Sequence, residues 1–254
     1  MKVAVLSNIF KEKDYNLKDV EDDLTLTGNA VIKALKSFNH EVEFFDVNEK
    51  TFEKLRRSNV EFAFNVCERF NGNSLFEPHV ASMLELLNIP YTGSGPWALS
   101  LCMNKVRVKE ILLQNGIPTP KYQVFYSRNK KLDPELKFPL IVKPAMMDNS
   151  IGINNDNVVY DEAGLRSKVG FINRTYGQPA LVEEYIEGRD IDAGVLGNGN
   201  NIIALPLAEI SYEEFPQNKN KIFSYEPKWD KGTDMYSTMY ICPIENMPKI
   251  VRNI

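Results

Sequence analysis

A lysine inside an apolar run is the clearest candidate for chemistry in this sequence. Lys143 lies in the segment FPLIVKPAMMDNSIGI, which covers residues 138–153. Residues 139–142 predict a short buried strand, where an unpaired ammonium costs several kcal/mol, so we expect Lys143 to meet an anion at the strand's end. A phosphate is the obvious anion. The alternative is a surface lysine whose apolar stem covers the strand while its ammonium reaches water before a turn.

The residues that follow Lys143 predict an oxyanion-binding loop. Asp148, Asn149, Ser150 and Gly152 supply hydroxyl, amide and backbone donors. Glycine lacks a side chain, which lets the backbone approach an oxyanion closely. We therefore expect this loop to contact the same phosphate as the lysine.

Lys105 is a second candidate for phosphate binding. Asn104 is a favourable N-cap for a helix from about Lys105 to Asn115, which Gly116 and the two prolines of the next segment end. A cation in the first turn opposes the helix dipole unless an anion binds at the same end. The placement therefore indicates another phosphate contact.

Two acidic residues lie on a predicted strand over residues 180–186. Strand alternation sends Glu183 and Glu184 to opposite faces, so one carboxylate can point into a cleft while the other meets solvent. Backbone groups at the end of such a strand suit the edge of an adenine ring, and an adjacent carboxylate can accept the hydrogens of its amino group. A half-exposed edge strand is the alternative.

The C-terminal part contains a hairpin signal and a candidate lid. Residues 190–196 and 202–210 predict a β-hairpin, because Asn-Gly favours a tight turn, so we do not assign the intervening glycines to phosphate binding. Further on, KIFSYEPKWD places Lys228 beside Tyr225 and Trp229. This segment either closes over a nucleotide as a lid or forms a surface hairpin.

The first 95 residues alternate apolar strands with helices. Strands are predicted over residues 3–6, 42–47, 60–66 and 89–91, and helices over residues 29–38, 49–57 and 78–87. This alternation is typical of a parallel α/β domain.

Ligands of parallel sheets bind beyond the carboxyl ends of the strands, so the loops after Leu6 and Val66 are the places to search. In the second of these loops, Glu68, Arg69 and Glu77 could hold a zwitterionic substrate. The alternative is that they are solvated loop charges.

Composition narrows the class of protein. Of the 254 residues, 43% are hydrophobic and 25% charged, and no apolar run approaches the roughly 20 residues that a membrane span requires. We expect two or three domains and, because no signal-peptide pattern opens the chain, a cytoplasmic location. The formal net charge of −4 argues against a nucleic-acid partner.

Disulfide and zinc chemistry have little support. Cys67, Cys102 and Cys242 are odd in number and widely spaced, so we interpret all three as reduced packing residues. His40 and His79 are the only histidines, which argues against a histidine-based zinc centre. We expect His79 on a helix surface.

Five segments, in order, resemble the ATP-grasp ligases, and among them the D-alanine–D-alanine ligases and their close relatives. They are MLELLNIPYTGSG, MNKVRVKEILLQNGIPTP, FPLIVKPAMMDNSIGI, LVEEYIEGRDID, and YEPKW followed by Cys242 and Pro243, all within residues 62–245. The resemblance implies a mixed α/β and α+β fold. It comprises a parallel α/β domain over residues 1–95, a small ATP-grasp subdomain over 96–186 and an incomplete large subdomain over 187–254, with ATP between the two subdomains.

Nine positions match functional residues of that family. They are the phosphate-binding lysines Lys105, Lys143 and Lys228, the flexible-loop Ser150, the adenine-contacting Glu183, the hinge strand Glu184, Tyr185 and Ile186, and the ribose-binding position Asp190. From this resemblance we expect Ser150 and Lys228 to take part in catalysis.

The implied activity is ATP-dependent joining of a carboxylate to an amine. One carboxylate attacks the γ-phosphorus to form an acyl phosphate, and the amine of a second small amino or carboxylic acid displaces phosphate. Peptidoglycan synthesis is one setting for this reaction. The expected partners are these small molecules and, in a homodimer, a second copy of the chain, without nucleic acid or membrane.

The sequence departs from the D-alanine–D-alanine ligases in two loops and at its end. SNIFKEKDYNLKDVEDD follows Leu6 in place of a glycine-rich pattern with a substrate-binding glutamate, and FNVCERFNG replaces a histidine-glycine pair. The pair of substrates therefore stays open.

The family's magnesium ligands follow the Cys-Pro segment farther along than this chain extends. We therefore expect ATP and Mg²⁺ as cofactors, metal ligands beyond residue 254, and no turnover by this chain alone. A nucleotide-binding module without catalysis is the alternative function, and a plain α/β small-molecule binder is a third.

Overall fold

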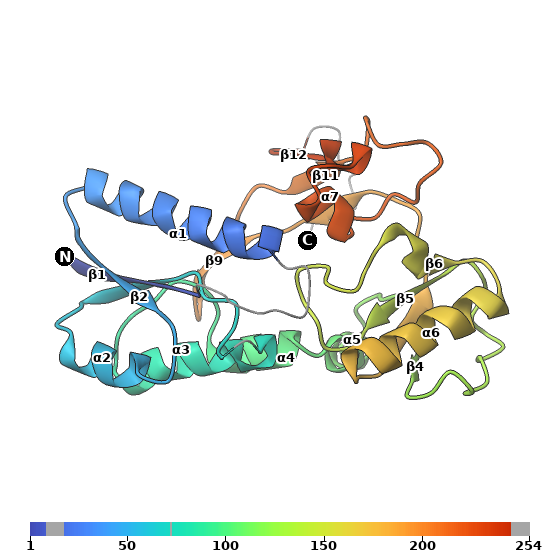
Figure 1. The fold of residues 1–254 in the computed structure, drawn as a ribbon, viewed down its shortest axis with the longest axis horizontal. Helices are drawn as coiled ribbons and strands as arrows, with labels where there is room; N and C mark the ends of the chain where they lie inside the picture. Colours follow the sequence, from blue (N-terminus) through green and yellow to red (C-terminus); the bar gives the residue numbers. More distant parts are fainter. Residues whose placement is uncertain (9–17, 72, 245–254) are drawn as a thin grey trace. The chain divides into compact units, whose positions relative to one another are not determined.

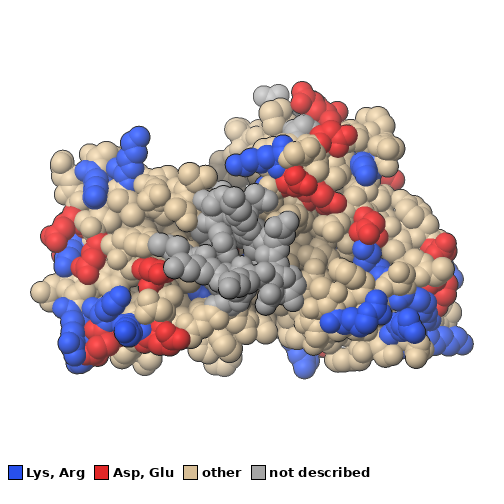
Figure 2. Space-filling model, viewed as in Figure 1, with Lys and Arg blue, Asp and Glu red and all other residues tan. Residues whose placement is uncertain are grey.

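The computed structural model describes residues 1–8, 18–71 and 73–244, without the side chains of residues 18–24 and 237. The chain divides into two compact units, which are Met1–Thr119 with Ala145–Asp148, and Pro120–Pro144 with Asn149–Ile254. On the face shown in Figure 2, lysine and arginine side chains are interspersed with aspartate and glutamate on each unit. No helix in the described ranges is long and apolar enough to cross a membrane.

The first unit contains the predicted parallel sheet. Its strands are β1 (Lys2–Ser7), β2 (Glu41–Asp46) and β3 (Phe62–Asn65), in the order β2-β1-β3. Both pairings are parallel. Helix α1 (Lys18–Ser37) lies on one face, and α2 (Thr51–Arg57) and α3 (Glu77–Leu86) lie on the other (Figure 1).

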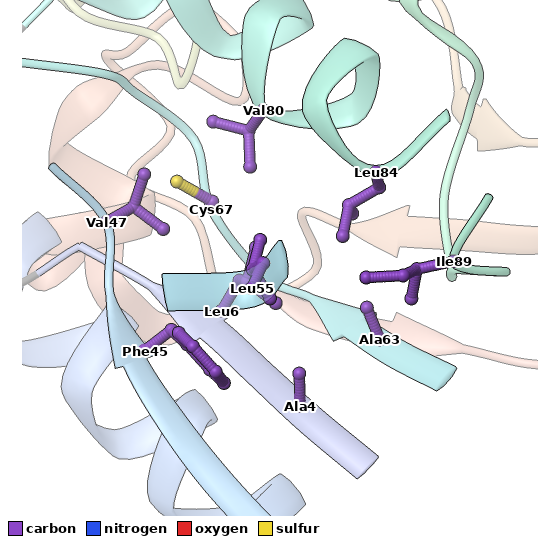
Figure 3. Close-up of a cluster of buried hydrophobic side chains, with 10 residues drawn as sticks. All are labelled: Ala4, Leu6, Phe45, Val47, Leu55, Ala63, Cys67, Val80, Leu84 and Ile89. Carbon is purple, nitrogen blue, oxygen red and sulfur yellow. The ribbon is translucent and has the colours of Figure 1, made fainter. Parts of the chain in front are cut away.

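The core of this unit follows from the alternation of β1. Ala4 and Leu6 point toward α2 and α3, where they pack against Leu55, Val80 and Leu84 (Figure 3). Val3 and Val5 leave from the opposite face and are also buried. A strand covered on both faces reads as a continuous apolar run, which explains why β1 was predictable.

Two predictions for this unit need correction. Helix α1 covers Lys18–Ser37, so it is already helical well before residue 29. Residues 89–91 form only an isolated parallel bridge, Ala63 to Tyr91, instead of a strand. Pro90 has no N–H to donate, although its carbonyl accepts from the Ala63 N–H at 2.8 Å.

The remaining elements of the first unit are a 3₁₀ turn, Ser74–Phe76, and the helices α4 (Pro96–Cys102) and α5 (Lys105–Gln114). The Asn104 side chain caps α5 as predicted, because it accepts from the N–H groups of Val106 and Arg107. Gly116, with φ +67°, follows the helix end.

The second unit contains a four-stranded sheet in the order β4-β7-β5-β6, with all three pairings antiparallel. Its strands are β4 (Tyr122–Phe125), β5 (Leu140–Pro144), β6 (Val158–Val159), which follows a 3₁₀ turn at Asn155–Asn157, and β7 (Ala180–Glu184). Helix α6 (Glu162–Tyr176) packs against β5 and β7 (Figure 1). The Asp161 side chain caps its start, and Gly177, with φ +62°, ends it.

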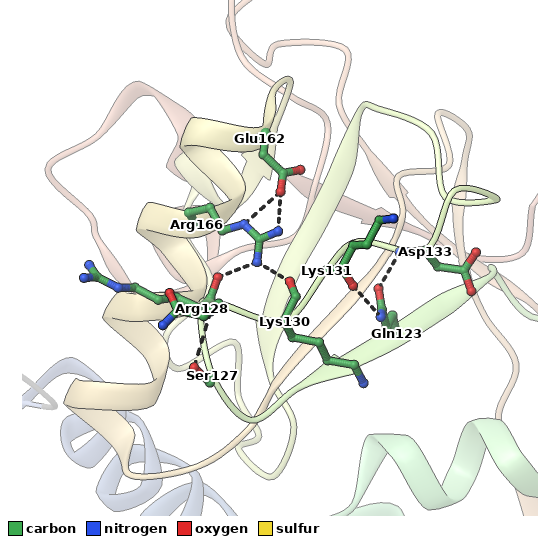
Figure 4. A network of polar contacts seen from close by, with 9 residues as sticks. Gln123, Ser127, Arg128, Lys130, Lys131, Asp133, Glu162 and Arg166 are labelled. Carbon is green, nitrogen blue, oxygen red and sulfur yellow. Dashed lines mark hydrogen bonds and ion pairs between the residues drawn. The ribbon is translucent and has the colours of Figure 1, made fainter.

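A polar network holds the connection between β4 and β5 (Figure 4). Arg166 of α6 pairs with Glu162 and donates to the carbonyls of Arg128 and Lys130. Gln123 of β4 donates to the Lys131 carbonyl at 3.0 Å, and its side-chain oxygen accepts from the Asp133 N–H at 2.9 Å. These bonds fix the long loop that leads into β5.

The predicted hairpin is confirmed, although it is interrupted. Strands β9 (Val195–Asn198) and β10 (Asn201–Ala204) pair around Gly199-Asn200. Strands β8 (Asp190–Asp192) and β11 (Ala208–Ser211) continue in a separate sheet, ordered β12-β11-β8, with β12 being Met239–Ile241. Their register is offset by one residue from that of β9 and β10, and Pro206, which cannot donate to the ladder, lies between β10 and β11.

The YEPKW segment forms a short helix, α7 (Tyr225–Trp229), so a surface hairpin there is wrong. A 3₁₀ turn, Asp234–Ser237, follows it. All three cysteines are free, as expected. Only Cys67 is a packing residue, however, because Cys102 and Cys242 are exposed. His79 lies on a helix surface as predicted.

Candidate active site

The second unit contains a cavity of about 450 Å³, which we call the larger cavity. Its lining comes from the ends of β5 and β7, from β8, and from the segment that leads into α7. These residues are Pro120, Ile141, Lys143, Ile153, Glu183, Glu184, Tyr185, Ile186, Asp190, Ile191, Asp192, Ile210, Lys221, Ile222, Phe223 and Lys228. Seven of the nine positions matched by resemblance therefore line one cavity.

Lys143 and Glu183 form an ion pair in the wall of the larger cavity. In the antiparallel register Glu183 of β7 lies opposite Ile141 of β5, and Lys143 is two residues further along the same face. The carboxylate is only 8% exposed and the lysine side chain 23%. Lys143 thus pairs with the carboxylate of a residue that the resemblance assigns to adenine, and its contact with a phosphate stays a prediction.

The strand beyond Glu183 lies at the rim of the cavity. The Glu184 carboxylate accepts from the Lys121 N–H at 3.3 Å, and Tyr185 donates from its hydroxyl to the Lys221 carbonyl at 3.4 Å. Tyr185 also packs against Ile141 and Ile222. Ile186 is exposed. This edge has both apolar surface and backbone groups.

Ser150 and Lys228 meet at the same aromatic residue. The Ser150 hydroxyl donates to the Phe223 carbonyl at 2.9 Å, and the Lys228 ammonium lies 4.7 Å from the centre of the Phe223 ring. The Trp229 indole donates to the Asn149 carbonyl at 3.0 Å. The loop after β5 and the segment around α7 are therefore joined by several bonds.

The backbone of the loop after β5 has an uncommon conformation. Asn149 and Ser150 have φ values of +49° and +58°, and Gly152 has +77°. Residues other than glycine seldom adopt positive φ, and successive N–H groups in such turns form concavities that suit anions. The expected oxyanion-binding loop therefore has a backbone geometry compatible with that task.

Lys105 belongs to the first unit. It begins α5, its N–H donates to the Ala145 carbonyl at 3.0 Å, and its ammonium contacts the Met147 carbonyl. Residues 145–147 directly follow β5 in the chain. Lys105 thus contacts the beginning of the loop whose later residues are Asn149 and Ser150.

A smaller cavity, of about 270 Å³, lies in the first unit beyond the carboxyl end of β3. Its lining is Thr27, Asn65, Val66, Cys67, Glu68, Glu77, Thr92, Gly93, Ser94 and Leu99. Two of the three predicted substrate residues, Glu68 and Glu77, are thus brought together. Arg69 is 4% exposed and is not part of this lining.

Asn8 positions the loop that carries Glu68. Its side-chain oxygen accepts from the N–H groups of Glu68 and Arg69 at 3.2 and 3.1 Å, and its amide donates to the Arg69 carbonyl at 2.8 Å. Asn8 lies in the loop after β1, and Glu68 and Arg69 lie in the loop after β3. The hydrogen bonds of Asn8 therefore join the two loops in which a parallel sheet is expected to bind its ligand. We did not single out Asn8 from the sequence, although it lies in the first of these loops.

The smaller cavity favours the protonated forms of Glu77 and Cys67. Burial, followed by the charges of Asp148 and Glu68, raises the pKa of Glu77 to about 7. Burial raises the pKa of the Cys67 thiol to about 12, so this cysteine stays a thiol. Glu77 therefore changes its charge near neutral pH.

Comparison with known proteins places the chain in a family. The model of the D-ala D-ala ligase C-terminus matches residues 111–254. A D-alanine–D-alanine ligase from Carboxydothermus hydrogenoformans is 32% identical over 241 residues, which cover 91% of this chain and 70% of that one. A protein of Sinorhizobium fredii is 32% identical over 209 residues, covering 79% of this chain and 60% of its own length.

The fold agrees with these sequence matches. The crystal structure of D-alanine–D-alanine ligase from Bacillus anthracis complexed with ATP is similar, with a TM-score of 0.67 and 24% identity, over 100% of this chain and 73% of that one. The class is that of the ATP-grasp ligases. Within it, the chain belongs to the D-alanine–D-alanine ligase family, and it spans 60 to 70% of the length of the two relatives described above.

Proposed function

We propose that this protein is an ATP-dependent ligase that joins the carboxylate of one small amino or carboxylic acid to the amine of another. The observation that carries the proposal is the larger cavity, where Lys143, Glu183, Asp190 and Lys228 line one space in a chain of this family. The lining of the larger cavity contains lysines, which suit phosphates, and carboxylates, which suit the amino and hydroxyl groups of a nucleoside.

In the proposed binding mode, ATP replaces the ion pair in the cavity wall. Its phosphates take the Lys143 ammonium, with Lys228 as a further phosphate contact, and Lys105 of the first unit keeps the phosphate-binding role that the resemblance implies. Glu183 accepts from the adenine amino group, residues 184–186 lie along the base, and Asp190 accepts from the ribose. The exchange keeps the buried Glu183 carboxylate and the lysine partnered, and so avoids a lone buried charge.

The proposed reaction proceeds through an acyl phosphate. A substrate carboxylate oxygen attacks the γ-phosphorus as the bond to ADP breaks, and the amine of the second substrate then attacks the acyl carbon, expelling phosphate. Phosphoryl transfer depends mainly on positioning and charge neutralisation, which lysines supply. We assign Lys228 to the transferred phosphate and Ser150 to holding the loop that covers it.

Magnesium is expected to accompany ATP by analogy with other enzymes that transfer its γ-phosphate. Within residues 1–8, 18–71 and 73–244, no group of three or more His, Cys, Asp or Glu side chains could hold a metal ion. The described residues therefore do not fit a protein-built metal cage, and we derive no step through the ion.

The smaller cavity is proposed to receive the amine end of a substrate. Two carboxylates, Glu68 and Glu77, line it together with polar Asn65, Thr92 and Ser94, and none of the lining residues is lysine or arginine. An ammonium group close to Glu77 would favour its charged form and lower its pKa again. Arg69 could act on a substrate only after its side chain moves, because it is 4% exposed.

Three further assignments stay proposals. They are the domain division at residues 95/96 and 186/187, assembly as a homodimer, and action in the cytoplasm on precursors of cell-wall peptides. Limited proteolysis tests the first, because cleavage concentrates in exposed linkers between domains. Light scattering of the purified protein tests the second.

The activity is tested by measuring phosphate and ADP release with magnesium-ATP and a panel of D- and L-amino acids and hydroxy acids. Because no turnover is expected from residues 1–254 alone, the assay also uses a form of the chain that carries the family's metal-binding segment, and from that form we expect equal release of both products, dependent on an added acid and amine. Lys228→Ala should abolish turnover, whereas Lys231→Ala, an exposed lysine nearby, should retain it. ATP binding without acid-dependent turnover would support a non-catalytic nucleotide module instead.

A further inference from the structure

Tyr212 contacts Asp190, the residue proposed to bind the ribose of a nucleotide. Tyr212 is not among the site residues predicted from the sequence. Its hydroxyl donates a hydrogen bond to Oδ2 of Asp190, which lines the larger cavity. Asp190 of β8 lies opposite Ile210 of β11, and Tyr212 follows two residues after Ile210, just beyond the strand end. Continued alternation brings the Tyr212 side chain to the same side as Ile210.

The phenol ring is held in place by its surroundings. Tyr212 is 8% exposed and lies in a buried cluster with Ile210, Phe215 and Met235. Its ring meets Phe215 edge to face, with 5.2 Å between the centres and 83° between the planes. Burial, then the hydrogen bond to Asp190, raises the pKa of Tyr212, so the hydroxyl stays protonated and remains a donor.

A fixed donor on one oxygen orients the whole carboxylate. An unsupported aspartate rotates about its side-chain bonds and loses that freedom when it binds a ligand. With Oδ2 held by Tyr212, Oδ1 is the acceptor that Asp190 presents to a ligand. The ribose of a nucleotide carries two adjacent hydroxyl donors, and a carboxylate in a fixed orientation suits one or both of them.

Asp192 is the neighbouring acid that must be distinguished from Asp190. It lies two residues further along β8 and also lines the larger cavity, but it is exposed. A carboxylate in contact with water gains less from binding a hydroxyl than a half-buried one held by a neighbour. Asp190 is therefore the better ribose ligand.

We propose that Tyr212 is a positioning residue, which holds the Asp190 carboxylate toward the ribose hydroxyls and makes the larger cavity select ribonucleotides over deoxyribonucleotides. The inference rests on the proposed function, since it requires ATP to bind in the larger cavity. It adds a residue and a selectivity that the family match does not supply.

The test compares the calorimetric affinities of ATP, 2′-deoxy-ATP and 3′-deoxy-ATP for four proteins. They are the wild type, Tyr212→Phe, Asp192→Asn and Tyr126→Phe, the last being a matched control because Tyr126 is 77% exposed. A hydrogen bond to a charged group corresponds to a preference of about tenfold for ATP over at least one analogue in the wild type. Tyr212→Phe should weaken ATP binding and leave the analogues unchanged, so that the preference falls toward one.

The controls decide what a change means. Tyr126→Phe and Asp192→Asn should keep the wild-type preference. An unchanged preference in Tyr212→Phe, or an equal loss for all three nucleotides, overturns the positioning role while leaving ATP binding intact. Absence of ATP binding by the wild type would instead overturn the proposed function.

If the thermal midpoint without nucleotide shows that Tyr212→Phe is unfolded, a second variant is used in its place. Phe215→Leu keeps the Tyr212 hydroxyl but removes the aromatic edge that holds its ring. A looser ring should reduce the preference for ATP by a smaller factor than loss of the hydroxyl. A preference equal to that of the wild type in this variant overturns the inference.

Discussion

Lys143 and Glu183 face each other across two antiparallel strands and form an ion pair that closes one wall of the larger cavity. Each is also the residue that the family resemblance assigns to a different part of ATP. The pair therefore has two consequences, one for the stability of the protein without ligand and one for nucleotide binding.

Lys143→Ala should destabilise the protein without nucleotide by about 1–3 kcal/mol, because it removes a partly exposed cation from the buried Glu183 carboxylate. Adding Glu183→Gln should recover part of that loss. The matched control is Lys121→Ala, whose ion pair with Glu135 is exposed to solvent, so this change should affect stability much less than Lys143→Ala does. Urea unfolding of the four proteins measures the effect, and equal losses in the two lysine variants would contradict it.

The same Lys143→Ala variant should lose most of its stabilisation by ATP. A ligand at 100 times its dissociation constant stabilises a protein by about 2.7 kcal/mol, and Lys143 is proposed to supply a main phosphate contact. The shift in the thermal midpoint on adding a non-hydrolysable ATP analogue measures this stabilisation. Should the variant keep the full wild-type shift, Lys143 does not bind the phosphates.

The loop after β5 and the segment around α7 should become protected together when nucleotide binds. Bonds of Ser150 and Trp229 already join residues 149–150 to residues 223–229, so ordering one segment orders the other. Hydrogen exchange should slow in residues 146–152 and 223–228 on adding a non-hydrolysable nucleotide. Strand β1 of the first unit, which carries none of the proposed nucleotide contacts, is the internal reference, and unchanged exchange in both segments would exclude a closing lid.

Glu77 should make the protein less stable as the pH rises from about 5 to 7.5. A carboxyl group whose pKa is raised in the folded protein contributes stability that is fully present below 4.5, its ordinary value, and is lost as the pH rises through about 7. Glu77→Gln should therefore gain stability relative to the wild type at the upper end of this range. Urea unfolding at several pH values measures the difference.

Glu53→Gln is the control with the opposite sign. Hydrogen bonds from Arg56 and Arg57 lower the pKa of Glu53 to about 2, so its contribution is present above 4.5 and is lost as the pH falls through about 2. Its stability difference from the wild type should be flat between pH 5 and 7.5. A flat difference for Glu77→Gln as well would show that Glu77 ionises normally.

Gly152→Ala should destabilise the fold by about 2–4 kcal/mol, because two penalties add at this position. Its φ is +77°, and a new Cβ would lie 2.8 Å from both Pro144 and Tyr176. Gly199→Ala isolates the first penalty, since its φ is +55° with nothing within 4 Å, and should cost about 1 kcal/mol. Similar losses in the two variants would show that Pro144 and Tyr176 give way.

The sequence by itself determined the elements whose signals are local. The apolar run of β1 and the Asn104 cap of α5 each depend on a few neighbouring residues, and such preferences act whatever the rest of the chain does. The resemblance to the D-alanine–D-alanine ligases was likewise readable without coordinates, and the family match over residues 111–254 and the 32% identity with a ligase confirm it.

Only the tertiary structure decided which side chains meet. The partner of Lys143 depends on the register between β5 and β7, strands that α6 separates in the chain, and Tyr212 reaches Asp190 only because β11 pairs with β8. The α7 helix likewise replaced a surface hairpin that local propensity had left open. Such contacts depend on strand pairing and on burial of both partners. Both effects come from parts of the chain that are distant in sequence, so the residues next to each partner do not reveal them.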